Sequence, residues 1–295
     1  MGVPTLGCGC PVCTSSDPHD RRLRPSILVR WPCPDAEGVE AQPSNANGQQ
    51  ETSQKPDPPN LHGLQHHEPR RYENDQSRPC ERVVLIDTGP DFREQALRSD
   101  IRRVDAVFYT HSHADHILGM DDLRPLSFAT FRKSGPIPLY VTAETRGSME
   151  RIYSYTFSPD ARYTNRARVA LLDVSSGARV HEVFFAPVPV FHGDLPITGY
   201  RFGNTAYLTD VSMIPESSFG LLRDLDVLVV SALRHVPHPS HATVLQAVKW
   251  ANRIGAKRTY FTHISHDLGH EETNANLPEG VELAYDGLTL PVTLS

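Results

Sequence analysis

The sequence predicts an α/β fold, and three of its features carry that prediction. Short apolar runs rich in β-branched and aromatic residues, such as residues 104–109 and 225–232, have the length of buried strands. Amphipathic stretches such as residues 143–153 alternate with these strands and have helical periodicity. A length of 295 residues with 39% hydrophobic content suits one large α/β domain or two small ones.

Composition and charge exclude several classes of protein. No apolar run approaches the roughly 18 residues that a membrane span requires, and the start lacks a basic segment followed by an apolar one. We therefore expect a cytoplasmic protein. The formal net charge of −6 argues against nucleic acid as the main partner, because nucleic-acid binders usually carry a basic stripe. The basic run at residues 21–24 is either a contact for one phosphate or a solvated loop.

Three of the five cysteines lie close together near the start of the chain. At this spacing Cys8, Cys10 and Cys13 cannot easily form disulfides among themselves, whereas three thiolates can surround one zinc ion. A structural zinc site normally has four protein ligands. The fourth ligand is therefore expected from elsewhere in the chain.

A segment of unusual composition separates the first two predicted strands, residues 26–31 and 82–86. Residues 34–80 are rich in Pro, Gln, Asn, Ser and Glu, so they cannot bury enough apolar surface to offset the entropy of ordering. We expect a disordered insertion in a β-hairpin, with residues 1–33 and 81–295 forming one globular domain. Cys33 and Cys80 bracket the insertion and are expected to be free thiols in a reducing compartment, a disulfide being the alternative.

Four potential metal ligands follow directly after the strand at residues 104–109. They are His111, His113, Asp115 and His116. Imidazole and carboxylate ligands in such a cluster can serve two adjacent divalent metals. A solvated histidine-rich loop would not be expected at a strand end, followed by Gly119 and a predicted helix at residues 117–122, after which the chain is expected to leave the helix at residues 123–126.

The pattern His-x-His-x-Asp-His after a hydrophobic strand resembles the signature of the metallo-β-lactamase fold hydrolases. The resemblance implies a four-layer αβ/βα sandwich with a dinuclear metal site, and it implies where the other ligands lie. His192 follows residues 183–191, read as a strand pair, and precedes a hairpin, as expected for a ligand of this family. Asp210 follows that hairpin and matches the bridging aspartate, a helix N-cap being the alternative.

The last predicted ligands follow the strand at residues 258–261. His263 completes the active-site set by the same resemblance, and His266 is the candidate for the fourth ligand of the cysteine site. Asp87, in a turn similar to the one that supports the metal loop in this family, either orients a ligand histidine or caps the turn. The tail at residues 281–294 is expected to form a hairpin around Asp286 and Gly287.

The cysteine cluster, paired with Thr-His-x-Ser-His, resembles the branch of phosphoribosyl cyclic phosphodiesterases of phosphonate degradation. In that branch a strand and a Gly/Thr/Ser-rich turn precede a similar Gly-Val-Pro and cysteine cluster. Because this chain begins inside the motif, its first strand is expected to be missing. The sheet edge left exposed could then invite a homodimer.

Three further histidines occur within seven residues after the strand at 225–232. His241 lies immediately before a predicted helix at residues 243–254, where a substrate anion would meet free backbone N–H groups. With a pKa near neutrality it could protonate a leaving alkoxide or hold a phosphate oxygen, and the resemblance places a substrate-handling histidine there. His235 and His238 are expected to have structural or surface roles. Arg124 is either a phosphate contact or part of a salt bridge.

These assignments combine into one hypothesis, a phosphodiesterase that opens a small cyclic phosphodiester with a metal-bound hydroxide. Two zinc or manganese ions and one structural zinc are implied, with Asp115 and His241 as the catalytic residues. One active-site metal would take His111, His113 and His192, the other Asp115, His116 and His263, with Asp210 as the bridge.

Three alternatives to the phosphodiesterase are compatible with the same residues. An RNA-processing nuclease uses a similar metal set, although the sequence offers no basic arm to grip RNA. A thioester or lactone hydrolase needs the same hydroxide. The alternative outside enzymes is a non-catalytic zinc-binding interaction module, which would be expected to have lost a ligand.

Overall fold

The computed structural model describes residues 2–34, 80–160 and 162–294. The chain separates into two units, Met1–Val29 with Val83–Ser295, and Arg30–Arg82. Of the insertion predicted to be disordered, residues 35–79 lie outside the described residues. Within them, no helix combines the length and the apolar character that crossing a membrane requires.

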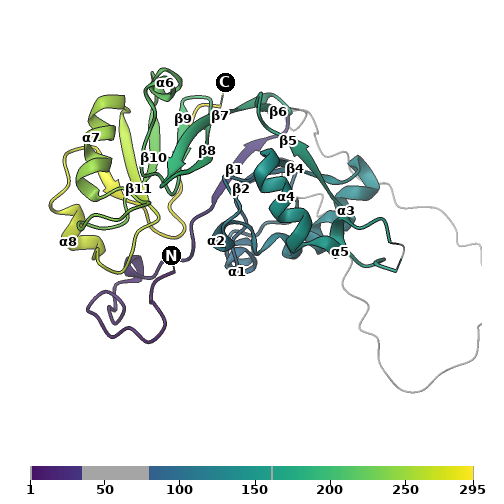
Figure 1. The fold of residues 1–295 in the computed structure, drawn as a ribbon, viewed down its shortest axis with the longest axis horizontal. Coiled ribbons are helices and arrows are strands. Elements are labelled where there is room, and N and C mark those ends of the chain that lie inside the picture. Colours follow the sequence, from purple (N-terminus) through teal and green to yellow (C-terminus); the bar gives the residue numbers. More distant parts are fainter. Residues whose placement is uncertain (1, 35–79, 161, 295) are drawn as a thin grey trace, which may run out of the picture. The chain divides into compact units, whose positions relative to one another are not determined.

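Two sheets form the framework of the first unit (Figure 1). The five-stranded sheet has the order β1 (Ile27–Pro32), β2 (Glu81–Ile86), β3 (Ala106–Phe108), β4 (Ile137–Val141), β5 (Val169–Asp173). The seven-stranded sheet has the order β12 (Val281–Leu283), β11 (Arg258–Thr262), β10 (Val227–Ser231), β9 (Thr205–Leu208), β8 (Leu195–Phe202), β7 (Val183–His192), β6 (Ala178–Val180).

The sheets pack face to face, with helices on their outer sides. The Phe108 ring on β3 contacts Phe185 on β7 and Tyr200 on β8, with ring centroids 4.5 and 5.2 Å apart. Figure 1 shows α3, α4 and α5 beside the first sheet and α7 and α8 beside the second. This arrangement confirms the predicted αβ/βα sandwich. The helices are α1 (Phe92–Arg98), α2 (Ala114–Ile117), α3 (Arg124–Ser134), α4 (Ala143–Ile152), α5 (Ser154–Phe157), α6 (Glu216–Phe219), α7 (Val244–Ile254) and α8 (His270–Asn274), with short 3₁₀ turns at Pro18–Asp20, Met120–Leu123 and Gly220–Leu222.

Strand direction decides where functional side chains can meet. Strands β2 to β5 are parallel to one another, as are β9 to β12. Strand β7 is antiparallel to β8, which is antiparallel to β9, so β7 runs in the same direction as β9. The carboxyl ends of β7, β9, β10 and β11 therefore lie along one edge of their sheet, the edge at which α/β proteins place ligands.

Local sequence fixes where helix α7 begins and ends, and so holds the loop that precedes it at this edge of the sheet. Thr243 accepts a hydrogen bond from the Gln246 backbone N–H, and the Gln246 side chain accepts one from the Thr243 N–H, which completes a capping box. Gly255 ends the helix in the left-handed conformation that glycine adopts without steric cost (φ 71°). Ala247 and Ala251 face the buried core, so the loop before Thr243 is held against the sheet edge.

Three predicted elements differ from the structure. The helix predicted at residues 117–122 is instead the end of α2 at Ile117 and the 3₁₀ turn Met120–Leu123, and residues 124–126 do not leave a helix but begin α3, because Pro125 lies in its first turn, where proline is tolerated. Residues 183–191 belong to a single strand, β7, in which Pro187 lies beyond the segment paired with β6. The tail forms β12 but no second strand among the described residues, because the Thr293 carbonyl accepts from Asn204 N–H instead.

The expectation of free thiols at Cys33 and Cys80 is wrong, because the two residues form a disulfide. Their Cα atoms are 5.3 Å apart, within the range that a disulfide can bridge. The Cys33 backbone N–H donates to the Cys80 carbonyl at 2.9 Å, so the two ends of the insertion are held together by backbone pairing as well.

Candidate metal centre

Seven side chains converge at the carboxyl ends of strands. The strands concerned are β3, β7, β9 and β11, and each metal-type side chain lies at a strand end or in the loop that follows. The converging residues are His111, His113, Asp115, His116, His192, Asp210 and His263. These are the seven that the sequence singled out, and the structure brings them together although 152 positions separate the first from the last.

Three residues at these strand ends adopt a backbone conformation that side chains other than glycine rarely occupy. The φ angles are +64° at Asp87 after β2, +56° at Asp210 after β9 and +53° at His263 after β11. Each such residue costs about 1–2 kcal/mol, so it persists only where surrounding contacts determine it. Strain repeated after three strands, one in the first sheet and two in the second, is typical of a functional site.

The loop after β3 is held by close approach of its backbone to neighbouring turns. A Cβ atom at Gly89 would lie 2.1 Å from the Asp115 carbonyl oxygen, and one at Gly119 would lie 2.1 Å from the Gly89 oxygen. The Thr88 N–H donates to the His116 carbonyl, and the Gly119 N–H donates to the Thr88 carbonyl, both at 2.8 Å. Only glycine permits this packing at the two positions.

Asp210 lies between two groups of ligand-type atoms. One group is formed by His111, His113 and His192 with Asp210, and the other by Asp115, His116 and His263. The Asp210 carboxylate oxygens lie 3.3 Å from the Nε2 atoms of both His116 and His263. They also lie 3.9 Å from the Nε2 atoms of His111 and His192. A carboxylate in this position faces both groups at once.

In three of the five histidines the opposite ring nitrogen contacts the protein, which fixes the orientation of the imidazole. The Nδ1 atom of His116 donates to Asp87 at 2.8 Å, that of His192 donates to the Ser240 carbonyl, and that of His111 lies 3.0 Å from Thr110 Oγ1. Asp87 also accepts from Thr110 N–H and Oγ1, each at 2.8 Å. Of the two roles expected for Asp87, orientation of a ligand histidine is the one these contacts support.

Burial and charge set the protonation of the site. Burial and the neighbouring His116 hold the pKa of His111 well below its usual value. Burial opposes the charge on Asp210, yet His263 and His116 bring the pKa of this carboxyl well below its usual range. Burial would also lower the pKa of His116, but Asp210 and Asp87 raise it well above the ordinary value. In the absence of metal, His111 is therefore neutral, Asp210 ionised and His116 protonated at pH 7, so His116 must lose its Nε2 proton before it can bind a metal.

The donor set passes a physical test for divalent metal ions. The Nε2 atoms of His111 and His116 are buried without a hydrogen-bond partner among the described residues, although both rings are oriented by their Nδ1 atoms. A buried polar atom without a partner is costly unless something binds it. Imidazole and carboxylate ligands suit zinc and manganese, so cations fit the space that these atoms surround.

The ring of His241 lies beside the converging histidines, but its pKa differs from the predicted one. Its ring centroid is 4.5 Å from that of His192 and 4.9 Å from that of His263. Burial, reinforced by the neighbouring His263, lowers the pKa of His241 to about 3 rather than leaving it near neutrality. At pH 7 the imidazole is neutral, so it can donate a hydrogen bond but carries no spare proton until an anion binds beside it.

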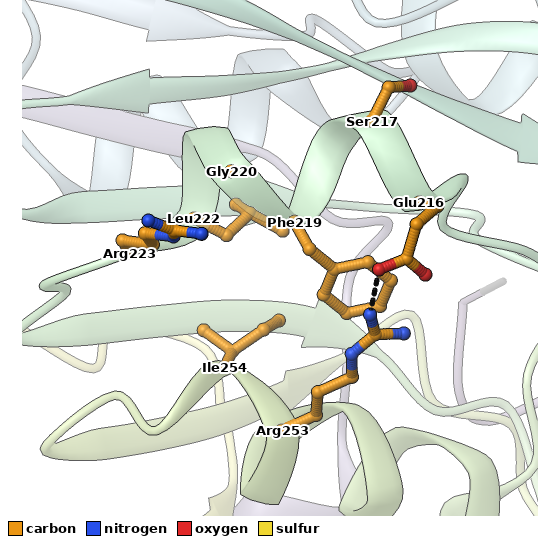
Figure 2. Close-up of a pocket in the computed structure, with 8 residues that line it drawn as sticks. All are labelled: Glu216, Ser217, Phe219, Gly220, Leu222, Arg223, Arg253 and Ile254. Carbon is orange, nitrogen blue, oxygen red and sulfur yellow. Dashed lines mark hydrogen bonds and ion pairs between the residues drawn. The ribbon is translucent and has the colours of Figure 1, made fainter.

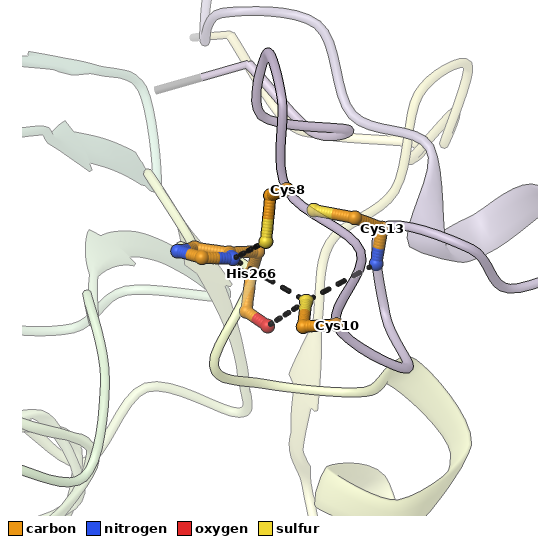
Figure 3. A group of neighbouring side chains, drawn as sticks. All are labelled: Cys8, Cys10, Cys13 and His266. Carbon is orange, nitrogen blue, oxygen red and sulfur yellow. Dashed lines mark hydrogen bonds between the residues drawn. The ribbon is translucent and has the colours of Figure 1, made fainter.

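The cysteine cluster forms a second group of ligand atoms (Figure 3). His266 Nδ1 lies 3.3 Å from Cys8 Sγ and 3.4 Å from Cys10 Sγ, and all four ligand atoms lie within 4.8 Å of one another. A tetrahedral zinc ion with Zn–S near 2.3 Å and Zn–N near 2.0 Å separates its ligands by about 3.5–3.8 Å. The backbone N–H of Cys13 lowers the pKa of the Cys10 thiol to about 6, which favours the thiolate that binds zinc.

Several other candidate residues have structural contacts instead. The Arg124 guanidinium donates to the Asn165 carbonyl, and within residues 2–34, 80–160 and 162–294 no salt bridge of Arg124 is found. His238 is hydrogen-bonded to Ser240, and its ring lies 4.9 Å from that of His241, nearer the centre than a surface role implies. Arg22, from the basic run read as a solvated loop or phosphate contact, is buried and paired with Asp20.

A surface pocket of about 370 Å³ lies apart from the seven converging side chains. Figure 2 shows its lining, in which Arg253 stacks on the Phe219 ring at 3.6 Å and pairs with Glu216. None of the seven residues lines this pocket.

The sequence could not identify the residues that contact the Nδ1 atoms of the ligand-type histidines. Ser240 acts through its backbone carbonyl, which any residue type supplies, so no sequence signal distinguishes it. Thr110 bonds both Asp87 and His111, and its position directly before the first ligand was the available hint. The contacts of Arg22 join positions 243 residues apart, which no local pattern reveals.

Comparison with known proteins places the chain in a family. The model of the β-lactamase superfamily domain matches residues 82–264, and the chain belongs to this superfamily. The structure is similar to the crystal structure of a diphosphatase from the PhnP family, with 44% identity and a TM-score of 0.77. The similarity covers 100% of this chain and 94% of that one. This likeness supports the branch that the cysteine cluster predicted.

Two sequence relatives carry different names. An octanoyltransferase of Porphyromonas gingivalis is 31% identical over 291 residues, which are 97% of this chain and 48% of the relative. The chain thus spans about half the length of that relative, whose name describes the whole protein. A ribonuclease Z of Ligilactobacillus salivarius is 37% identical over 62 residues, 20% of each chain.

Proposed function

We propose that this chain is a metal-dependent hydrolase that opens a small cyclic phosphodiester. The observation that carries the proposal is the position of the Asp210 carboxylate, whose oxygens lie 3.3 Å from Nε2 of both His116 and His263 and 3.9 Å from Nε2 of His111 and His192. A carboxylate that bridges two histidine groups suits two cations roughly 3.5–4 Å apart.

The chain would hold the two ions with different ligand sets. His111, His113 and His192 would bind one ion, and Asp115, His116 and His263 the other, with Asp210 shared. When bound, two divalent ions lower the pKa of a water molecule and neutralise charge on phosphoryl oxygens. Asp87 would keep the proton on Nδ1 of His116, so that Nε2 stays available to a ligand.

His241 would act on the substrate rather than on the metals. Its neutral imidazole can donate a hydrogen bond to a phosphoryl oxygen, and the negative charge of a bound phosphate would raise its pKa from about 3 toward the value that proton transfer to a leaving alkoxide needs. Helix α7 begins three residues further on, but the Val244 and Gln246 N–H groups of its first turn already donate to the Arg234 carbonyl and to Thr243 Oγ1.

A second candidate is hydrolysis of a diphosphate, in which the bond broken is a phosphoanhydride. It is favoured by the likeness to a PhnP-family diphosphatase, which is 44% identical to this chain. The same ligand set serves both reactions, because each displaces an oxygen from phosphorus. The two reactions differ in the leaving group. Hydrolysis of a diphosphate releases a stable phosphate anion, so this reaction depends less on protonation by His241.

Nuclease, thioesterase and non-catalytic functions have weaker support. The ribonuclease match covers only 62 residues, and the net charge of −6 does not favour RNA. A thioester substrate is suggested only by the name of the octanoyltransferase, to which this chain corresponds over half the length. A non-catalytic zinc module would not be expected to keep all seven ligand-type residues in contact distance.

The proposal is tested with a panel of substrates on protein purified without chelator and reloaded with Zn²⁺ or Mn²⁺. The panel contains a ribose 1,2-cyclic phosphate, a 2′,3′-cyclic nucleotide, a nucleoside diphosphate sugar, a short RNA and an octanoyl thioester. We expect the highest kcat/KM for a cyclic phosphodiester. A preference for the diphosphate would favour the second candidate, and hydrolysis of the thioester or RNA alone would refute both.

A further inference from the structure

One short loop joins the two groups of metal-type side chains. His263 belongs to the proposed dinuclear centre and His266 to the cysteine cluster, and only two residues separate them. The Ser265 N–H donates to the Leu233 carbonyl at 3.0 Å, which fixes the loop to the end of β10. Because His263 has a left-handed backbone (φ +53°), the loop must be held on both sides for this conformation to persist.

Arg22 provides the second anchor of the loop comprising residues 263–268. Its guanidinium donates to the Ser265 carbonyl at 3.1 Å and to the Leu268 carbonyl at 2.8 Å. It also donates to the His19 carbonyl at 3.2 Å and pairs with Asp20 at 3.1 Å. The residue is only 5% exposed, so a buried charge is used to hold backbone carbonyls rather than to meet solvent.

The cysteine cluster continues the same attachment. Cys8 and Cys10 contact His266 Nδ1, and Cys10 also lies 3.8 Å from the His266 carbonyl. Asp20 accepts from His270 N–H at 2.8 Å, beyond the far end of the loop. The segment from Cys8 to Arg22 therefore holds the loop along its length.

We propose that Arg22 and the cysteine cluster act as positioning groups for His263, and thereby set the affinity for the metal ion that Asp115, His116 and His263 would share. Release of the N-terminal segment frees the C-terminal half of the loop, and His263 then relaxes from its strained backbone. The ion at His111, His113 and His192 is not affected in this way, because none of those residues lies on the loop. The inference rests on the dinuclear centre proposed above.

The chain offers a matched control in Arg24. This residue anchors the same N-terminal segment, but through Asp91 at the start of α1, with distances of 2.9 and 3.0 Å from its Nη1 to the carboxylate oxygens. None of the hydrogen bonds that Arg24 makes in the described residues reaches residues 263–268. Arg22→Lys and Arg24→Lys thus remove the same guanidinium fork from one segment, and only the first touches the loop.

The experiment measures metal binding rather than turnover. The full-length wild type, Arg22→Lys and Arg24→Lys are equilibrated with buffered Zn²⁺ over a range of free concentrations, and bound metal is counted by mass spectrometry. We expect Arg22→Lys to bind one ion with about tenfold weaker affinity, while the wild type and Arg24→Lys bind this ion with the same affinity as each other. In Co²⁺-loaded protein, thiolate-to-metal charge-transfer absorption reports separately whether the cysteine cluster is still filled.

A second measurement needs no variant and so does not depend on folding of Arg22→Lys. Methyl methanethiosulfonate blocks the three free cysteines of the wild type, and Mn²⁺ in the dinuclear centre is followed by electron paramagnetic resonance. We expect the signal of a coupled pair to give way to that of a single ion. Unchanged affinity for both ions in the blocked protein and in Arg22→Lys would overturn the inference while leaving the proposed function intact. A wild type that binds no ions beyond the cysteine cluster would overturn both.

Discussion

The two groups of metal-type residues are built in opposite ways. In the dinuclear centre, His111, His116 and Asp210 are 0–3% exposed and are held by strand ends and by Asp87. In the cysteine cluster, Cys8, Cys10 and Cys13 lie on a half-buried loop with few backbone hydrogen bonds of its own. The first group is therefore shaped by the fold, whereas the second holds its loop in place through whatever it binds. Single substitutions in each group can test this contrast.

The largest effect is expected from Asp210→Ala. Removing the shared carboxylate leaves His116 and His263 without the charge that lies 3.3 Å away, so both ions lose a ligand. We expect hydrolysis to fall by at least about 10³-fold together with loss of the active-site metals. Asp194→Ala, an exposed residue two positions after His192, should keep both. Normal turnover by Asp210→Ala would contradict the assignment of the bridge.

His241→Ala should separate catalysis from metal binding. We expect kcat to fall by about 10²–10⁴-fold with metal content unchanged, because the ligand sets proposed for the two ions are complete without His241. The loss should be smaller for a substrate with a p-nitrophenolate leaving group, which needs no proton. An equal loss for good and poor leaving groups would argue against a role in protonation.

Cys8→Ser probes the other side of the comparison. Loss of one thiolate should empty the cysteine cluster and destabilise the protein by about 3 kcal/mol, since a structural metal contributes directly to folding. The free energy of unfolding is measured by urea titration, accompanied by loss of the cluster's ion and weaker binding of the ion proposed at Asp115, His116 and His263. Leu6→Ser, at a fully exposed position of the same loop, is the control and should change neither quantity.

Asp87→Asn tests whether metal binding at the proposed dinuclear centre depends on the hydrogen bond between Asp87 and His116 Nδ1. The amide can no longer attract the proton on Nδ1 of His116 as the carboxylate does, so we expect metal affinity to fall by about 10–100-fold. Asp100→Asn is matched to it, because both aspartates have positive φ and asparagine tolerates that conformation. Similar metal affinities for the two variants would assign Asp87 to turn formation alone.

The smallest effect concerns the metal-free protein at low pH. The pKa values of His111, His113 and His241 lie below the usual value, chiefly because of burial, so these residues stay neutral when folded and bind protons near pH 6.5 when unfolded. Their contribution to stability is present above that pH and is lost as the pH falls. His116, with a raised pKa, opposes this trend, so its contribution is present at low pH and is lost only as the pH rises through its folded-state value.

Because three histidines oppose one, we expect a net loss of stability between pH 7 and pH 5. Urea unfolding in the presence of chelator measures it. Equal or greater stability at pH 5 would show that the charge on His116 dominates.

The sequence predicted those parts of the molecule whose signals are local. The strand at residues 104–109 and the four ligand-type residues after it are adjacent in the chain, and β10, α7 and β11 carry clear periodicity, so the positions of these strands and this helix were expected correctly. Asp210 and His263 required the family resemblance, because nothing in their immediate neighbourhoods distinguishes a ligand from a cap. The sequence could show that such residues are present, but their convergence depends on the pairing of distant strands.

What the sequence did not reveal depends on long-range contacts. The Cys33–Cys80 disulfide forms because the two ends of the insertion are held 5.3 Å apart, a distance that composition does not encode. Arg22 lies in a basic run whose composition indicates solvent or a phosphate as its partner, yet its partners are carbonyls at positions 265 and 268. The lowered pKa of His241 likewise arises from burial and from His263, 22 residues away.

The most direct test of a dinuclear hydrolase counts metals and turnover in the same preparation. Protein purified without chelator is analysed for bound metal and assayed with bis-p-nitrophenyl phosphate. We expect about three ions per chain, two in the dinuclear centre and one in the cysteine cluster, together with hydrolysis of the phosphodiester. About one ion per chain without hydrolysis, after reloading with Zn²⁺ or Mn²⁺, would contradict the dinuclear assignment and favour a non-catalytic zinc protein.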